Sequence, residues 1–170
     1  MNAMLEAELL AHLDVQLASA RRLLALVLEQ GAAIRARDVE GVLGRLGDIQ
    51  TEMGRRGVLE QDRAALLQRA GAALRVPATQ VTLERLCLLI TPAGAAAARE
   101  RSAELRGLLA EIAREHGINR ALMRQELAFL AHLTRLIGFE PEGGYRPAGE
   151  PGRPAGPAGV PVHNVLNVQA

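Results

Sequence analysis

The first third of the chain carries an apolar stripe in which the spacings alternate between three and four residues. Residues spaced in this way share one face of an α-helix, and the heptad pattern is typical of a helix that packs along its length against another helix. We therefore expect a long first helix with a helical partner. The stripe consists of Leu10, Leu13, Leu17, Ala20, Leu24, Val27, Gly31 and Ile34.

A second apolar stripe begins directly after the segment "RARDVEG". Asp38 is a suitable N-cap for a helix that starts there. The connection is so short that it leaves only an antiparallel hairpin or a kinked continuation of the first helix. We favour the hairpin because it would bury both stripes. The second stripe consists of Val39, Val42, Leu46, Ile49, Met53, Leu59, Leu66, Leu67, Ala70 and Leu74.

Five glycines interrupt this second helix: Gly41, Gly44, Gly47, Gly54 and Gly57. An interior glycine costs about 1 kcal/mol relative to alanine, so we expect the second helix to fray or bend first. Glycines three residues apart can let a partner backbone approach closely, whereas the alternative is a solvated face with no such role. The sequence leaves both open.

A break at Pro77 separates this stripe from two further helical segments. The short segment "VTLERLCLLI" predicts an amphipathic helix with Leu83, Leu86, Cys87 and Ile90 on one side. Thr91 then suits an N-cap and Pro92 the first helical position, so a long third helix is expected over Pro92–Ile137. Gly117 is a position where this helix could kink, and Asn119 lies on its apolar seam, where a polar residue can fix the register.

After Gly138 dense proline and glycine replace the periodic pattern, and the only tyrosine, Tyr145, lies there. The sequence therefore predicts an all-α fold, an antiparallel bundle of three main helices and one short helix with coiled-coil-like packing. The expected domains are a helical bundle over residues 1–137 and a flexible tail over residues 138–170.

Composition supports a helical bundle and argues against several classes of partner. Hydrophobic residues make up 49% of the chain but aromatic residues only 2%, which indicates an aliphatic core. All 20 basic residues are arginines, the net charge is +1, and the charges are interleaved. We expect no nucleic-acid binding. The N-terminus "MNAMLEAELLAHL" resembles neither a signal peptide nor a membrane span, so we expect no membrane insertion. A single cysteine cannot form a disulfide within the chain, which fits a reducing cytoplasm.

Candidate catalytic and metal-binding groups are sparse. The four histidines, His12, His116, His132 and His163, are scattered and show no metal-ligand spacing. Cys87 lies between leucines with no basic neighbour to activate it. We therefore expect a protein without cofactor or enzymatic activity that works by offering a helical surface to another helix.

The order of these features resembles the FlgN family of flagellar export chaperones over roughly residues 5–150. Three motifs support the resemblance: "VLEQDRAALL" with Leu59, Glu60 and Arg63, "NRALMRQEL" from Asn119, and "YRPAG", in which Gly149 follows Tyr145 by four residues. One departure is His116, which stands where the family often has a second asparagine.

The resemblance implies a cytoplasmic chaperone that binds the C-terminal helices of hook-associated (hook-filament junction) proteins, prevents their premature assembly and delivers them to the flagellar export gate. Tyr145 and Gly149 would dock on the gate. The same third-helix residues could instead pack against the first two helices. The rival hypothesis is a generic coiled-coil adaptor or oligomerisation module, and a homodimer is compatible with either. The implied client-binding residues are Asn119, Leu122, Met123, Glu126, Phe129, Leu130, Leu133, Leu136 and Ile137.

Overall fold

The structure is a computed structural model that describes residues 3–137. Within these residues the secondary structure is helical, with no β-strand, as the all-α prediction requires. The predicted tail over residues 138–170 lies outside the described residues, so the domain boundary after residue 137 stays a prediction. The elements are α1 (Ala3–Ala36), α2 (Val39–Leu74), the 3-10 helix η1 (Ala78–Gln80), α3 (Leu83–Cys87) and α4 (Pro92–Leu136).

The chain divides into two units, Met1–His132 and Leu133–Ala170. The first contains α1, α2, α3 and α4 as far as His132, and the packing described below lies within it. In the second unit the described residues are the last turn of α4 and Ile137, where Leu133 is half-buried and Leu136 and Ile137 are exposed.

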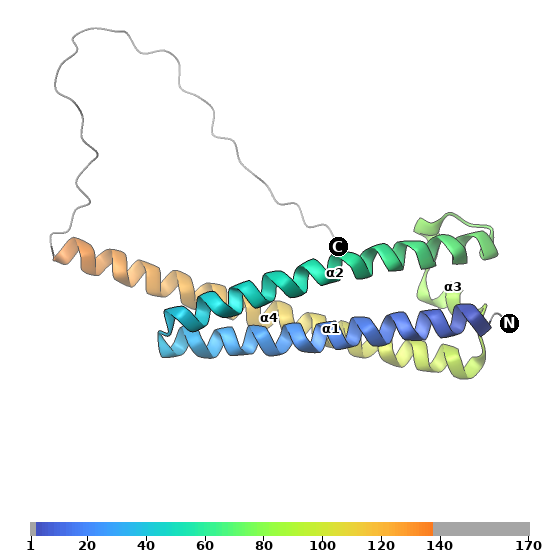
Figure 1. Ribbon diagram of the computed structural model, residues 1–170, viewed down its shortest axis with the longest axis horizontal. Helices are drawn as coiled ribbons and strands as arrows, with labels where there is room; N and C mark the ends of the chain where they lie inside the picture. Colours follow the sequence, from blue (N-terminus) through green and yellow to red (C-terminus); the bar gives the residue numbers. More distant parts are fainter. Residues whose placement is uncertain (1–2, 138–170) are drawn as a thin grey trace, which may run out of the picture. The chain divides into compact units, whose positions relative to one another are not determined.

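Helices α1 and α2 form the predicted antiparallel hairpin (Figure 1). Asp38 is the N-cap of α2, because its Oδ1 accepts a hydrogen bond from Gly41 N at 2.9 Å. The preceding residue, Arg37, has φ 56°, a left-handed conformation that reverses the chain between the two helices. The start of α2 could therefore be predicted from the sequence, because its N-cap, Asp38, bonds to a residue only three positions away.

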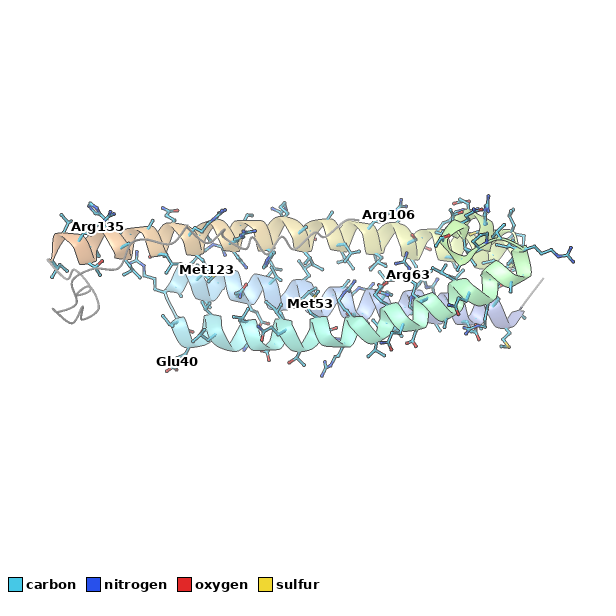
Figure 2. The ribbon with its side chains drawn as sticks, turned by 90° about the horizontal axis from the view of Figure 1, so that it is seen from above. Glu40, Met53, Arg63, Arg106, Met123 and Arg135 are labelled. Carbon is cyan, nitrogen blue, oxygen red and sulfur yellow. The ribbon has the colours of Figure 1, made fainter. Side chains whose placement is uncertain are left out.

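Helix α1 contacts both other long helices, and Figures 1 and 2 show α2 and α4 on two different sides of it. The predicted α1 stripe is buried at six of its eight positions, with Leu10 and Leu24 half-buried. Contacts to α4 include an ion pair between Arg101 Nε and Asp14 Oδ1 at 2.6 Å and a pair between Arg21 and Glu104. Because α2 and α4 cover α1 from two directions, α1 has more buried residues than either of the other long helices.

The main hydrophobic core lies where α3 joins the ends of the long helices. It combines the first half of α1, the last turns of α2, α3 and the start of α4, and the predicted face of the short helix is buried there at Leu86, Cys87 and Ile90. Thr91 caps α4 as predicted, accepting from Gly94 N at 3.0 Å. Helix α4 then runs without interruption through Gly117.

A buried polar cluster joins α1 and α2 near their middles. Glu52 of α2 is 2% exposed, and its Oε1 accepts a hydrogen bond from Ser19 Oγ at 2.6 Å. Arg22 donates to both carboxylate oxygens, at 3.1 and 3.2 Å. Burial raises the pKa of Glu52, but the hydrogen bonds from Arg22 and Ser19 outweigh it, so the pKa lies below its ordinary value.

The expectation that the hairpin buries the whole second stripe is wrong for the first half of α2. Val39, Leu46 and Met53 are exposed, whereas Leu66 and Ala70 near the end of α2 are buried. The reason is that apolar residues on α2 occupy two neighbouring faces, and α1 covers only one of them. The four glycines Gly44, Gly47, Gly54 and Gly57 have no heavy atom within 4 Å of an added Cβ, which favours the solvated-face interpretation.

Candidate functional site

An apolar groove lies beside the α1–α2 turn, and we call it the turn-end groove. Its volume is about 430 Å³. The end of α1, the first turns of α2 and the later part of α4 form its walls. The lining residues are Ile34, Arg37, Asp38, Val39, Val42, Leu43, Met123, Glu126, Leu127, Phe129 and Leu130.

Helical spacing places the apolar side chains of this groove. On α2, Val39 and Leu43 are four residues apart and therefore share a face; on α4, Met123, Leu127 and Leu130 do the same. These five side chains are between 40% (Met123) and 69% (Val39) exposed. Figure 2 shows Met123 on the side of α4 that faces the hairpin. Two helices thus present apolar rows to a shared space that the described residues leave unfilled.

The charged groups of the turn-end groove are engaged with the protein itself. Arg37 Nε lies 3.5 Å from Glu126 Oε2, which connects the turn to α4. Asp38 is occupied as the cap of α2. Because both members of the Arg37–Glu126 pair are largely exposed, the pair contributes at most about 1 kcal/mol. The arrangement favours binding of apolar side chains, with charge only at the rim.

The structure separates the nine residues, Asn119 to Ile137, that the sequence singled out as client-binding. Met123, Glu126, Phe129 and Leu130 line the turn-end groove. Leu122 is half-buried and is not part of the groove lining. Leu133, Leu136 and Ile137 belong to the second unit, and Tyr145 and Gly149 lie outside the described residues.

Asn119 lies in the interior, on the side of α4 that packs against α1. Its side chain is 2% exposed, and Nδ2 donates a hydrogen bond to Val27 O at 2.7 Å. Its Oδ1 lies 2.5 Å from the position that a Cβ on Gly31 would occupy. This geometry supports the register role predicted from the seam position, and we leave Asn119 out of the candidate binding surface.

Sequence reasoning missed the α2 side of the groove. Val39 and Val42 were placed in the second stripe and expected to be buried, and Leu43 was not selected. A signal was present, because α2 has more apolar positions in its first turns than one partner helix can cover. The sequence does not show that α2 and α4 run antiparallel with residues 39–43 beside residues 123–130, and this arrangement forms the groove.

Further properties of the described residues narrow the class of protein. None of the helices within residues 3–137 combines the length and the hydropathy needed to span a bilayer. The same residues contain no group of three or more His, Cys, Asp or Glu side chains arranged to hold a metal ion. Together with the turn-end groove, the fold defines a bundle of long helices that presents an exposed apolar surface.

Comparison with known proteins identifies the family. The model of the FlgN family, described as FlgN protein, matches residues 1–152, and the chain therefore belongs to this family. Membership makes it a flagellar export chaperone in general terms, as the resemblance implied. No curated protein and no solved structure matched the chain.

Proposed function

We propose that this chaperone holds the C-terminal helices of hook-filament junction proteins in the turn-end groove, in the cytoplasm, until they are exported. The observation that carries the proposal is the set of exposed apolar side chains that two antiparallel helices direct to one groove. A single exposed leucine needs no explanation, whereas a contiguous apolar patch marks a binding surface. An amphipathic helix docked by its apolar face is the partner that such a groove suits.

The mechanism is physical and requires no bond to be made or broken. A junction protein that has not yet assembled exposes apolar helical ends, and such surfaces aggregate. Each leucine-sized side chain that a partner inserts into the groove gains about 1.5–3 kcal/mol from burial. Covering the ends therefore keeps the client soluble, and release at the export gate exchanges one helix contact for another.

Delivery to the gate is the second part of the proposal. Tyr145 follows α4 in the sequence, and an amphipathic ring offers a large contact area with only two side-chain torsions to fix. Tyr145→Ala should leave helical content and client binding unchanged while it weakens gate binding and secretion. A variant that lost client binding would contradict this division of roles.

The test of client binding uses a matched pair of variants on α2. Leu43 is 61% exposed and lines the turn-end groove, whereas Val58 is 58% exposed and does not line it. Leu43→Asp should weaken binding of a co-expressed junction protein at least tenfold, which corresponds to about 1.4 kcal/mol. Val58→Asp should bind as the wild type does.

Co-purification and isothermal titration with the junction proteins, combined with light scattering on the free chaperone, provide the readout. Equal loss in both variants would show that the groove has no special role. Stable self-association of the free protein, with no binding of any junction protein, would support the oligomerisation module instead.

A further inference from the structure

A second groove lies at the other end of the hairpin, and we call it the α3-end groove. Its volume is about 370 Å³, and α1 forms part of its lining with Leu9, Leu13 and Gln16. Helix α2 contributes Glu60 and Leu67, and helix α4 contributes Ser102 and Leu109. The three helices that line the turn-end groove therefore line this one as well, together with α3, which adds Leu83 and Leu86.

One heptad series on α2 and one on α4 connect the two grooves. Residues seven positions apart share a helical face, with a drift of about 20° per heptad. On both helices, one such series begins in one groove and ends in the other. The series are Val39, Leu46, Met53, Glu60 and Leu67 on α2 and Ser102, Leu109, His116, Met123 and Leu130 on α4.

These series connect the two grooves along a line between α2 and α4, which we call the trough; Leu46, Met53 and His116, in its middle, line neither groove. Figures 1 and 2 show α2 and α4 on different sides of α1, so the trough occupies the place that a fourth helix has in a four-helix bundle. Beside Arg56, where the trough reaches the α3-end groove, Gly57 has no heavy atom within 4 Å of an added Cβ. The backbone of α2 is therefore open to a close approach there.

We propose that one amphipathic helix of the client lies along the whole trough, from the turn-end groove to the α3-end groove. This inference rests on the proposed function and specifies the length and the pattern of the ligand. The segment of α2 from Val39 to Leu67 spans about 42 Å at about 1.5 Å per residue, so the client helix has about eight turns. Its inward face is apolar toward the turn-end groove and more polar farther along, where it meets His116 of α4 and Glu60 of α2.

Charge identifies one position of the client helix. Arg56 lines the α3-end groove and forms no ion pair with a carboxylate within residues 3–137; its Nη1 lies 3.5 Å from Ser19 Oγ. Its neighbour Arg63 is already paired with Glu60 at 3.2 Å. An acidic side chain on the client, in the third of the helix that reaches the α3-end groove, pairs with Arg56.

A matched pair of variants on α4 tests the trough. Leu109 is 38% exposed and lines the α3-end groove, whereas Ile118 is 37% exposed and lines neither groove. The probes are synthetic peptides from the C-terminal helical region of a junction protein, one of about 30 residues and one restricted to the half that binds the turn-end groove. Affinities are measured by fluorescence anisotropy, and circular dichroism confirms that each variant is folded.

Leu109→Asp should weaken the long peptide at least tenfold and leave the short peptide unchanged, while Ile118→Asp changes neither. Arg56→Glu should weaken the long peptide, and replacing one acidic residue of that peptide with arginine should restore its affinity. If Leu109→Asp and Arg56→Glu bind the long peptide as the wild type does, while Leu43→Asp does not, the trough is wrong and the turn-end groove stands. If the wild type binds neither peptide, the proposed function fails as well.

Discussion

Gly31→Ala should destabilise the bundle, although the same substitution in an open helix stabilises. Replacing a helix-interior glycine with alanine gains about 1 kcal/mol from backbone propensity alone. At Gly31, however, the new Cβ would lie 2.5 Å from Asn119 Oδ1 and 3.3 Å from Asn119 Cγ. Carbon atoms prefer non-bonded neighbours at about 3.5–4.0 Å, so Asn119 or one of the two backbones must move.

The magnitude depends on what the movement breaks. The amide of Asn119 is planar, so displacing Oδ1 also displaces Nδ2, which donates to Val27 O at 2.7 Å. Leaving a buried amide unsatisfied costs about 1–3 kcal/mol. After the propensity gain of about 1 kcal/mol is subtracted, Gly31→Ala should lower the free energy of unfolding by up to about 2 kcal/mol.

Gly44→Ala is the matched control, because Gly44 is also inside a long helix but has no heavy atom within 4 Å of an added Cβ. It should raise the free energy of unfolding by about 1 kcal/mol. Urea unfolding followed by circular dichroism measures both variants, and the melting temperature should shift by about 2–4 °C per kcal/mol.

A double variant locates the cause. If the clash with Asn119 is responsible, Gly31→Ala combined with Asn119→Ala should be less destabilised than the sum of the single variants, because the amide that obstructs the Cβ is gone. Additive effects, or a Gly31→Ala variant as stable as Gly44→Ala, would refute the close approach of α1 and α4 at this point.

Three further predictions concern stability. The pKa of Glu52 is lower in the folded protein than its ordinary value of 4.5, so ionised Glu52 stabilises the fold above pH 4.5, and this stabilisation is lost as the pH falls below that value. The Glu52→Gln variant should therefore be less stable than the wild type at pH 7, and its urea midpoint should decline less between pH 5 and pH 3. Thr91→Ala should cost about 1 kcal/mol by thermal melting, since Thr91 Oγ1 accepts from Gly94 N at 3.0 Å and donates to Glu6 Oε1 at 3.0 Å. Burial raises the pKa of the Cys87 thiol, so a thiol reagent at neutral pH should react in step with unfolding, and rapid labelling of the folded protein would contradict the packing of α3.

The parts of the fold that the sequence predicted depend on local chemistry or on complete burial. Asp38 and Thr91 cap their helices by hydrogen bonds to residues three positions away, so each cap is visible in four consecutive letters. The α1 stripe also predicted burial well, because two helices cover α1 and bury six of the eight stripe positions. The exposure of Leu46 and Met53 could not be predicted in the same way, because periodicity shows that a helix face is apolar but not whether another helix covers it.

Long-range features were missed for a related reason. Glu52 reads as an ordinary surface acid, and its partners Ser19 and Arg22 are 33 and 30 residues away in the sequence. The resemblance supplied Met123, Phe129 and Leu130 as binding residues, but one wall of a groove does not predict the other. The opposite wall follows only when the register between α2 and α4 is known.

That register depends on the interior contact between Asn119 and α1, which links the stability of the bundle to its binding surface. Met123 follows Asn119 by four residues, so the position of Asn119 on Val27 fixes where Met123 lies relative to Val39 and Leu43. Sliding α4 by one helical turn would move its groove residues by about 5.4 Å and offset the two walls. A buried polar residue restricts such sliding, because any other register leaves its amide without a partner. The asparagine that the sequence suggested as a client contact therefore acts from inside the bundle, by holding the two apolar walls in apposition.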